Sequence, residues 1–166
     1  MNETGTVNRI EFFWDPICPF AWMASLWLRR VAALRDIDVE WRFINLSILN
    51  EERDYEAEFP EGYREGHNRG RRMLRVAAAV RNDHGADAMG PLYEAFGRSI
   101  WHRVPEPGED LRSHVGTPEH LCAVLRLRGS TRRMRLLPMI PRSTTSCGLG
   151  PRTRWVVPAV TWAHRS

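Results

Sequence analysis

The sequence predicts an α/β fold that opens with two parallel strands joined by a helix and then continues in helices. Two observations support this prediction. Residues 8–45 alternate between strand-like and helix-like patterns, whereas from residue 63 onward apolar residues recur at helical spacing. With 166 residues, the chain is also long enough to form one domain with a substantial hydrophobic core.

The opening segment is predicted to be a β-α-β unit. Residues 8–15 are rich in aromatic side chains and end at Asp-Pro, which is typical of a buried strand. Pro19 suits the first position of a helix, because its missing N–H would have no partner there, and apolar residues continue this helix to about Asp36. Residues 38–45 alternate apolar and charged side chains, as a half-buried strand does. Two such strands imply a parallel pair with a right-handed crossover.

The middle of the chain is predicted to be mainly helical. Residues 50–62 are polar and acidic, which indicates a loop. Residues 63–83 and about 87–100 each place apolar side chains on one helical stripe. After a Pro- and Gly-containing turn, Thr117 and Pro118 indicate the start of another helix.

Charge is unevenly distributed along the chain. The formal net charge is +4, and every basic residue other than histidine is arginine. All acidic residues lie between Glu3 and Glu119, whereas residues 120–166 contain nine arginines and no acid. Residues 126–166 lack sustained periodicity and their local signals conflict, which argues against a selected fold there. This tail could contact phosphates, but without organised helix or aromatic spacing we expect no nucleic-acid partner.

The remaining bulk properties favour a cytoplasmic protein. No apolar run approaches the roughly 20 residues of a membrane span, and residues 1–8 are polar, so we expect neither a membrane partner nor a secretory signal. Stable disulfides are rare in the cytosol. The histidines at positions 67, 84, 102 and 114 lack the spacing of metal ligands. We therefore expect them to face solvent and predict no metal site.

The segment from Trp14 to Trp22 contains the candidate chemistry, because it places Cys18 where a strand turns into a helix. The first amides of a helix lack intrahelical partners and its dipole is positive there, so both favour a thiolate, the nucleophile of thiol–disulfide exchange. A cysteine among apolar residues is more often a small buried hydrophobe, but the strand–Cys–Pro–helix context favours a reactive thiol. Trp14 and Trp22 flank the thiol and either line a substrate groove or pack in the core. The predicted active-site turn consists of Asp15, Pro16, the catalytic candidate Cys18, Pro19, Phe20 and Ala21.

This segment resembles the active-site turn of the DsbA-like thioredoxin family, which uses Cys-Pro-x-Cys. The actinobacterial branch described as mycothiol-dependent nitroreductase-like is more similar, since further motifs occur in order between about Arg9 and Arg103. The resemblance implies a thioredoxin-like fold in which residues 1–59 begin the main domain and residues 60–125 form an inserted helical domain. It also implies redox chemistry with a low-molecular-weight thiol, mycothiol or glutathione, as co-substrate and with no bound cofactor. The further motifs are Leu46-Ser47-Ile48-Leu49-Asn50-Glu51, Tyr63-Arg64-Glu65, Val76-Ala77-Ala78-Ala79, His84-Gly85-Ala86 and Pro91-Leu92-Tyr93.

The chain departs from this family at the second cysteine of the motif. Ala21 stands at that position, so the turn cannot close an internal disulfide. Cys18 would then act as a single thiol and form a mixed disulfide with a small thiol, after reaction with a small electrophilic or disulfide substrate. Nothing in the sequence places Cys122 or Cys147 near it.

A second departure lies near the C-terminus. Val115-Gly116-Thr117-Pro118 has the letters of a late family motif, but it comes early and precedes a helical start. Shifting the reading frame of residues 160–165 by one base yields His-Val-Gly-Thr-Pro. We therefore hypothesise that residues after about Leu125 arise from a frameshift and that the closing strands are missing or disordered, which the DNA sequence around codons 120–130 would test.

Two alternatives to a thiol oxidoreductase stay open. The first is a defective or non-catalytic thioredoxin-like remnant, because a sheet without its last strands loses core burial and keeps an open edge. The second is an isomerase similar to the kappa-transferases, which share the fold and bind glutathione. Replacing Cys18 by Ser separates this isomerase from a thiol oxidoreductase, since isomerase turnover could survive the change and thiol exchange could not.

Overall fold

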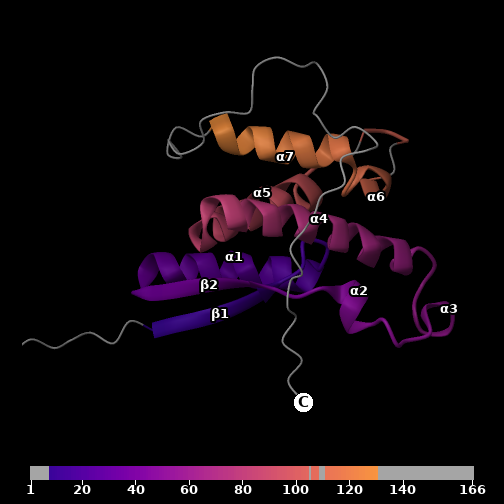
Figure 1. Ribbon diagram of the computed structural model, residues 1–166, viewed down its shortest axis with the longest axis horizontal. Coiled ribbons are helices and arrows are strands. Elements are labelled where there is room, and N and C mark those ends of the chain that lie inside the picture. The colour runs from indigo at the N-terminus through magenta and orange to yellow at the C-terminus, as the bar shows by residue number, and fades with distance from the viewer. Residues whose placement is uncertain (1–7, 105, 109–110, 131–166) are drawn as a thin grey trace, which may run out of the picture.

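A computed structural model describes residues 8–104, 106–108 and 111–130. It is a mixed α/β structure, mostly helical, with β1 and β2 at the bottom of Figure 1, α1 next to them, α4 and α5 above and α7 farthest away. The elements are β1 (Asn8–Trp14), α1 (Pro19–Leu34), β2 (Ile37–Phe43), α2 (Leu46–Leu49), α3 (Tyr55–Glu58), α4 (Tyr63–His84), the 3-10 helix η1 (Ala86–Ala88), α5 (Met89–Trp101), α6 (Leu111–His114) and α7 (Pro118–Ser130).

The predicted opening β-α-β unit is confirmed. β1 and β2 pair in parallel from Asn8 opposite Ile37 to Trp14 opposite Phe43. Alternate residues of the two strands point to opposite faces of the sheet. One face carries aromatic rings that pack into the core, including Phe12 against Trp41 at 5.2 Å between ring centroids. The other face carries charged side chains in ion pairs: Arg9–Glu40, Arg42–Glu11 and Arg42–Glu40.

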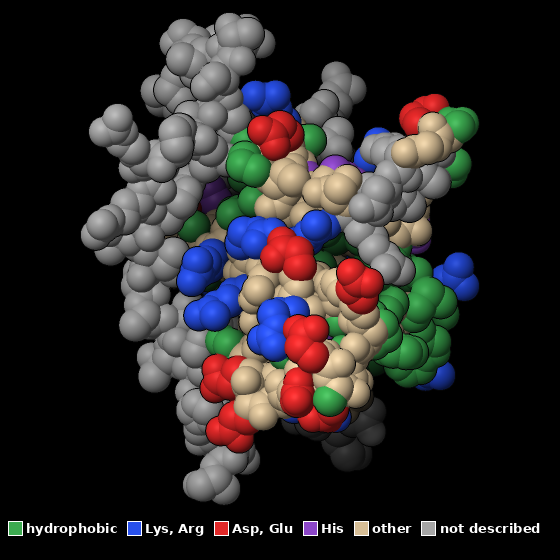
Figure 2. Space-filling view, turned by 90° about the vertical axis from the view of Figure 1, so that its right-hand side faces the viewer, with side chains coloured by type: hydrophobic (Ala, Val, Ile, Leu, Met, Phe, Trp, Pro, Cys, Tyr) green, Lys and Arg blue, Asp and Glu red, His purple; other side chains and the backbone are tan. Residues whose placement is uncertain are grey.

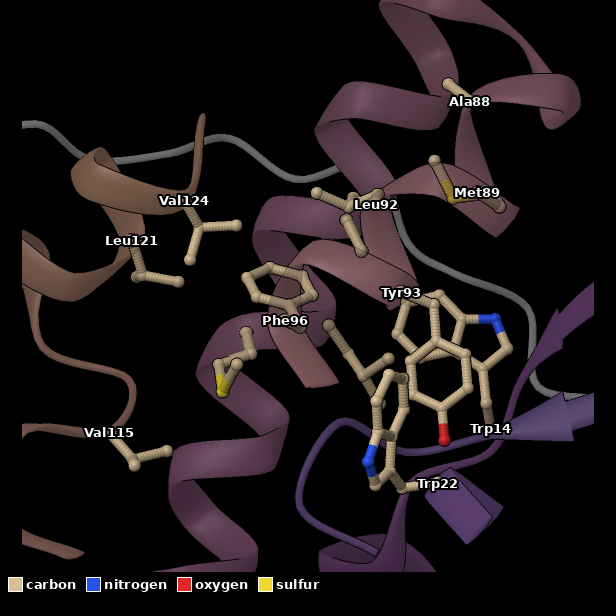
Figure 3. Packing of buried hydrophobic residues seen from close by; sticks show 13 residues of the cluster. Trp14, Trp22, Ala88, Met89, Leu92, Tyr93, Phe96, Val115, Leu121 and Val124 are labelled. Atoms are coloured by element: carbon tan, nitrogen blue, oxygen red, sulfur yellow. The ribbon is translucent and has the colours of Figure 1, made fainter. Parts of the chain in front are cut away.

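The core lies between the sheet and the helices α1, α4, α5 and α7 (Figure 3). Tyr93 of α5 lies at its centre. Its ring stacks on Trp14 at 4.5 Å and meets Trp22 edge-on at 5.8 Å, so it joins the strand, the first helix and the helical layer. The fully buried large side chains are Trp14, Tyr93, Phe96, Met73, Met89, Leu92 and Val124.

Helix α1 has apolar side chains on two faces. Trp22 and Leu28 are buried against the core, whereas Phe20, Met23 and Trp27 are exposed on the opposite side. A helix that is apolar on both faces is typical of one covered on both sides. In the described residues, only the core face of α1 is covered by the rest of the structure.

The loop predicted for residues 50–62 was only partly correct. These residues include the short helix α3. Asp54 caps the N-terminus of α3 by accepting hydrogen bonds from the backbone amides of Glu56 and Ala57. Helix α7 continues past Leu125 to Ser130, so the first residues of the predicted tail lie in a helix. The other residues of the predicted irregular tail, the proposed frameshifted segment and Cys147 lie outside the described residues. The predicted division into residues 1–59 and 60–125 stays a prediction.

Candidate active site

Cys18 caps the N-terminus of α1, as its position before Pro19 predicts. Its Sγ accepts the backbone N–H of Ala21 at 3.5 Å, and its backbone adopts an extended conformation rather than a helical one. Its carbonyl accepts the amide of Trp22 at 3.0 Å, which is the first bond of the helix. The thiol is free and partly exposed. A sulfur held here lies at the positive end of a helix of 16 residues.

Asp15 lies directly behind this turn and is fully buried. Its carboxylate accepts the backbone amides of Ile17 at 3.1 Å and Leu46 at 2.9 Å, and its carbonyl accepts the amide of Cys18 at 3.1 Å. Burial raises the pKa of this carboxyl group to about 6, against the lowering effect of the two amides. The site therefore contains an acid that changes charge near neutral pH, a property that the sequence did not predict.

Gly70 of α4 allows this helix to approach the turn. A Cβ at Gly70 would lie 2.5 Å from Oδ1 of Asp15 and 2.7 Å from Cγ1 of Ile17. Such distances are far below van der Waals contact, so no other residue fits without movement. The turn is thus held between β1, the start of α2 and the middle of α4.

The two tryptophans that flank the thiol are buried in the core. Trp14 is fully buried, and the ring of Trp22 lies so close to Gly97 that a Cβ there would meet it at 2.1 Å. Of the two interpretations left open by the sequence, core packing describes both residues. The exposed aromatic ring next to the thiol belongs to Phe20, which is 83 % exposed.

Tyr93 packs against both tryptophans that flank the thiol in the sequence. Burial raises the pKa of its hydroxyl most, the negative charge of Cys18 raises it further, and a side-chain hydrogen bond with Ser25 lowers it. The sequence placed Tyr93 correctly on the apolar stripe of a helix.

The histidines only partly match the prediction that they face solvent. His84 and His102 are exposed, but His67 is buried and its Nδ1 lies 2.7 Å from the hydroxyl of Tyr55. The imidazole of His67 is directed inward from α4, and this hydrogen bond supplies the partner that a buried polar group requires. Within the described ranges, no group of three or more His, Cys, Asp or Glu side chains could hold a metal ion.

The surface near α3 and the start of α4 carries both charge signs side by side (Figure 2). Glu65 contacts Arg69 and Arg72, and Arg53 contacts Glu58. These pairs neutralise one another locally, which differs from the single-sign patch that attracts a polyanion. In the part of the chain that the structure describes, no helix combines the length and apolarity required to cross a membrane.

These features define a class of protein: a mixed α/β chain that presents a free thiol at the N-terminus of the helix after its first strand. Residues 17–125 match the family described as Rv2466c-like, the mycothiol-dependent nitroreductase Rv2466c. This match covers well over half of the 166 residues, so the chain belongs to that family of thioredoxin-fold oxidoreductases. The resemblance to the mycothiol-dependent branch is thereby confirmed.

The chain is also similar to a curated protein of Mycobacterium tuberculosis (strain ATCC 25618 / H37Rv), the uncharacterized protein Rv2286c. The two are 41 % identical over 44 residues, which is 26 % of this chain and 19 % of that protein. The chain thus matches about a fifth of the length of this relative.

Proposed function

We propose that this chain is a thiol oxidoreductase in which Cys18 is the single nucleophile and a low-molecular-weight thiol such as mycothiol is the co-substrate. The contact between Cys18 Sγ and the amide of Ala21 is the observation that supports it most directly. The amide stabilises negative charge on the sulfur, and the partial exposure of Cys18 leaves it open to attack a substrate. Membership of a mycothiol-dependent family supports the choice of thiol.

The proposed reaction is two successive thiol–disulfide exchanges. In the first, the Cys18 thiolate attacks a small disulfide, so that one Cys18–sulfur bond forms, the substrate S–S bond breaks and one thiolate leaves and takes up a proton from water. In the second, a thiolate of the co-substrate attacks the outer sulfur. A new small disulfide forms, and the electron pair of the broken bond returns to Cys18. Ala21 cannot supply an internal thiol, so the co-substrate thiol performs this second step.

Asp15 is the buried acid of the proposed site. With its pKa raised to about 6 it is mostly ionised at neutral pH, but it can take up a proton at modest cost. The fixed amides of Ile17 and Leu46 hold its carboxylate in place. We include the cytoplasmic location in this proposal, because it supplies the reduced thiols that the second step consumes.

Mass spectrometry of the intact chain tests this proposal. After incubation with mycothiol disulfide near pH 7, we expect one mycothiol adduct at Cys18, which reduced mycothiol then removes. The Cys18→Ser variant should form no such adduct, while circular dichroism shows the same helix content. The remnant interpretation predicts no adduct on the folded wild-type chain, and a folded chain without one would contradict the proposal. Isomerase turnover that survives in Cys18→Ser would instead favour the kappa-transferase-like alternative.

A further inference from the structure

The outer face of α1 carries a row of large apolar side chains that the described residues leave uncovered. Phe20 is 83 % exposed, Trp27 is 67 % exposed and Leu34 is 82 % exposed. Met23 lies between the first two along the chain and is 65 % exposed. Single exposed apolar side chains are common on protein surfaces, but a contiguous row of this size is typical of an interaction surface.

The spacing of this row is that of a helix that packs against another helix. Phe20, Trp27 and Leu34 follow one another at intervals of seven residues, which is close to two helical turns. Apolar residues that recur in this way form the seam along which two helices contact each other. Met23 and Val31 lie on the same side of the helix, beside the row. These five residues, the outer seam of α1, extend over about 21 Å with Trp27 at the centre.

The outer seam is complementary to a second copy of itself. In an antiparallel pair centred on Trp27, Phe20 of one copy comes opposite Leu34 of the other. The same twofold rotation brings Met23 opposite Val31, and the two Trp27 side chains meet on the axis. Each apolar side chain of the seam therefore meets an apolar partner, and the two helix dipoles oppose each other.

The charge next to the outer seam favours the antiparallel direction. Of the two arginines in α1, Arg29 donates to the carbonyl of Gly90 on the core side, whereas Arg30 is exposed beside the seam. A parallel pair in register would place the two Arg30 side chains opposite each other, which is unfavourable for like charges. In the antiparallel pair Arg30 comes opposite Ala24, and the two Arg30 positions lie about 9 Å apart along the helix axis.

The area of the outer seam suits a second copy of the chain. An aromatic side chain can remove roughly 150–250 Å² from water. The four most exposed side chains of two seams together remove on the order of 1,000 Å², which is near the lower size of specific protein–protein interfaces. An interface of this size is expected to have a dissociation constant in the micromolar range, so the two copies should separate on dilution.

We propose that the outer seam of α1 is a homodimer interface, in which two copies of this chain pack antiparallel around a twofold axis at Trp27. This inference goes beyond the proposed function and does not depend on the chemistry of the thiol. The uncovered face of α1 is then the surface that the second copy covers.

Sedimentation equilibrium of the full chain tests this interface, with a reducing agent present so that no disulfide joins the copies. We expect a dimer at high micromolar concentration that becomes a monomer on dilution. Trp27→Glu places like charges together on the axis and should raise the dissociation constant about a hundredfold. Val104→Glu is the matched control, because Val104 is 83 % exposed but lies outside α1, and it should leave the dissociation constant unchanged.

Two results of this experiment would overturn the proposal. A folded wild-type chain that stays monomeric at high micromolar concentration would mean that another segment of this chain or an unlike partner covers the outer seam. A dimer that Trp27→Glu does not weaken would mean that the copies meet elsewhere. Circular dichroism should show the same helix content in both variants, because each replaces an exposed side chain.

Cross-linking tests the antiparallel direction independently. In chains that also carry Cys18→Ser, an equal mixture of Ala24→Cys and Arg30→Cys brings the two new thiols opposite each other in the antiparallel pair. Mild oxidation should therefore join position 24 to position 30, as mass mapping of the cross-linked peptides measures, and each variant alone should cross-link less. Cross-links formed mainly between like positions would indicate a parallel pair and contradict the proposed arrangement.

Discussion

The buried polar groups of two regions differ in their hydrogen bonding and their pKa values. One region is the helical layer between α5 and α7, and the other is the turn that holds the thiol. Between α5 and α7, His120 has both ring nitrogens engaged: Nε2 lies 2.8 Å from the hydroxyl of Ser99, and Nδ1 accepts the amide of Gly116 at 3.1 Å. Around Cys18, by contrast, Asp15 is buried with a raised pKa. The first arrangement is typical of a structural contact, and the second of a functional site that tolerates a cost in stability.

The contrast also predicts opposite responses to pH. Burial lowers the pKa of His120 to about 4, and burial raises that of Asp15 to about 6. Each group therefore prefers to be neutral in the folded chain. Acid destabilises the helical layer through His120, whereas a rise in pH destabilises the thiol turn through Asp15.

The largest expected change in stability concerns His120. Between pH 6.5 and about 4 the unfolded chain binds a proton there that the folded chain does not, so the free energy of unfolding decreases as pH falls through this window. The full difference is about 3 kcal/mol. Urea unfolding at pH 7 and pH 4.5 measures it, with His120→Gln as the variant that lacks this titration. An equal pH dependence in the variant would show that His120 is not responsible.

A slightly smaller effect of opposite sign is expected from Asp15. Between pH 3.8 and about 6 the folded chain retains a proton that the unfolded chain has lost, so the free energy of unfolding decreases as pH rises through this window. The contribution is about 3 kcal/mol at most. Unfolding of the wild-type chain and of Asp15→Asn between pH 5 and pH 8 should differ in slope. Parallel curves would mean that this carboxyl group is not held in its neutral form by burial.

Two glycine substitutions in α4 test whether the helix is tightly packed where it contacts the turn. Gly70 lies at that contact, whereas Gly66 has open space around it. Gly70→Ala should lower the free energy of unfolding by about 1–3 kcal/mol, because the new Cβ overlaps Asp15, which two backbone amides hold in place. Gly66→Ala, one turn earlier, has open space and should raise it by about 0.5–1 kcal/mol. Thermal and urea unfolding of the two variants measure this difference. The account of the turn is wrong if both changes have the same sign.

The sequence predicted the helices and strands whose positions depend on local patterns of residues. β1, α1, β2, α4 and α5 begin and end within a few residues of their expected positions, because strand alternation, Pro19 and helical spacing act over short stretches of chain. The position of Cys18 as a cap of α1 followed from the same signals. The short helix α3 was missed, since a single turn leaves little periodicity to detect.

The parts of the site that the sequence did not predict all depend on contacts between distant residues. Asp15 is buried because Leu46 and Gly70 close over it, and Tyr93 stacks on Trp14 because α5 packs against β1. His67 was expected to face solvent, but Tyr55 supplies a partner that permits its burial. Such pairings require the positions of whole elements relative to one another, which spacing along the chain does not give.

The reactivity of Cys18 is the most direct test of the account. The rate of its alkylation by iodoacetamide at pH 7 can be measured by mass mapping, with free cysteine in the same solution as the reference. A sulfur stabilised as a thiolate by the amide of Ala21 and the N-terminus of α1 should react faster than free cysteine. A rate equal to or slower than that of free cysteine, in a chain shown to be folded, would contradict the assignment of Cys18 as the nucleophile.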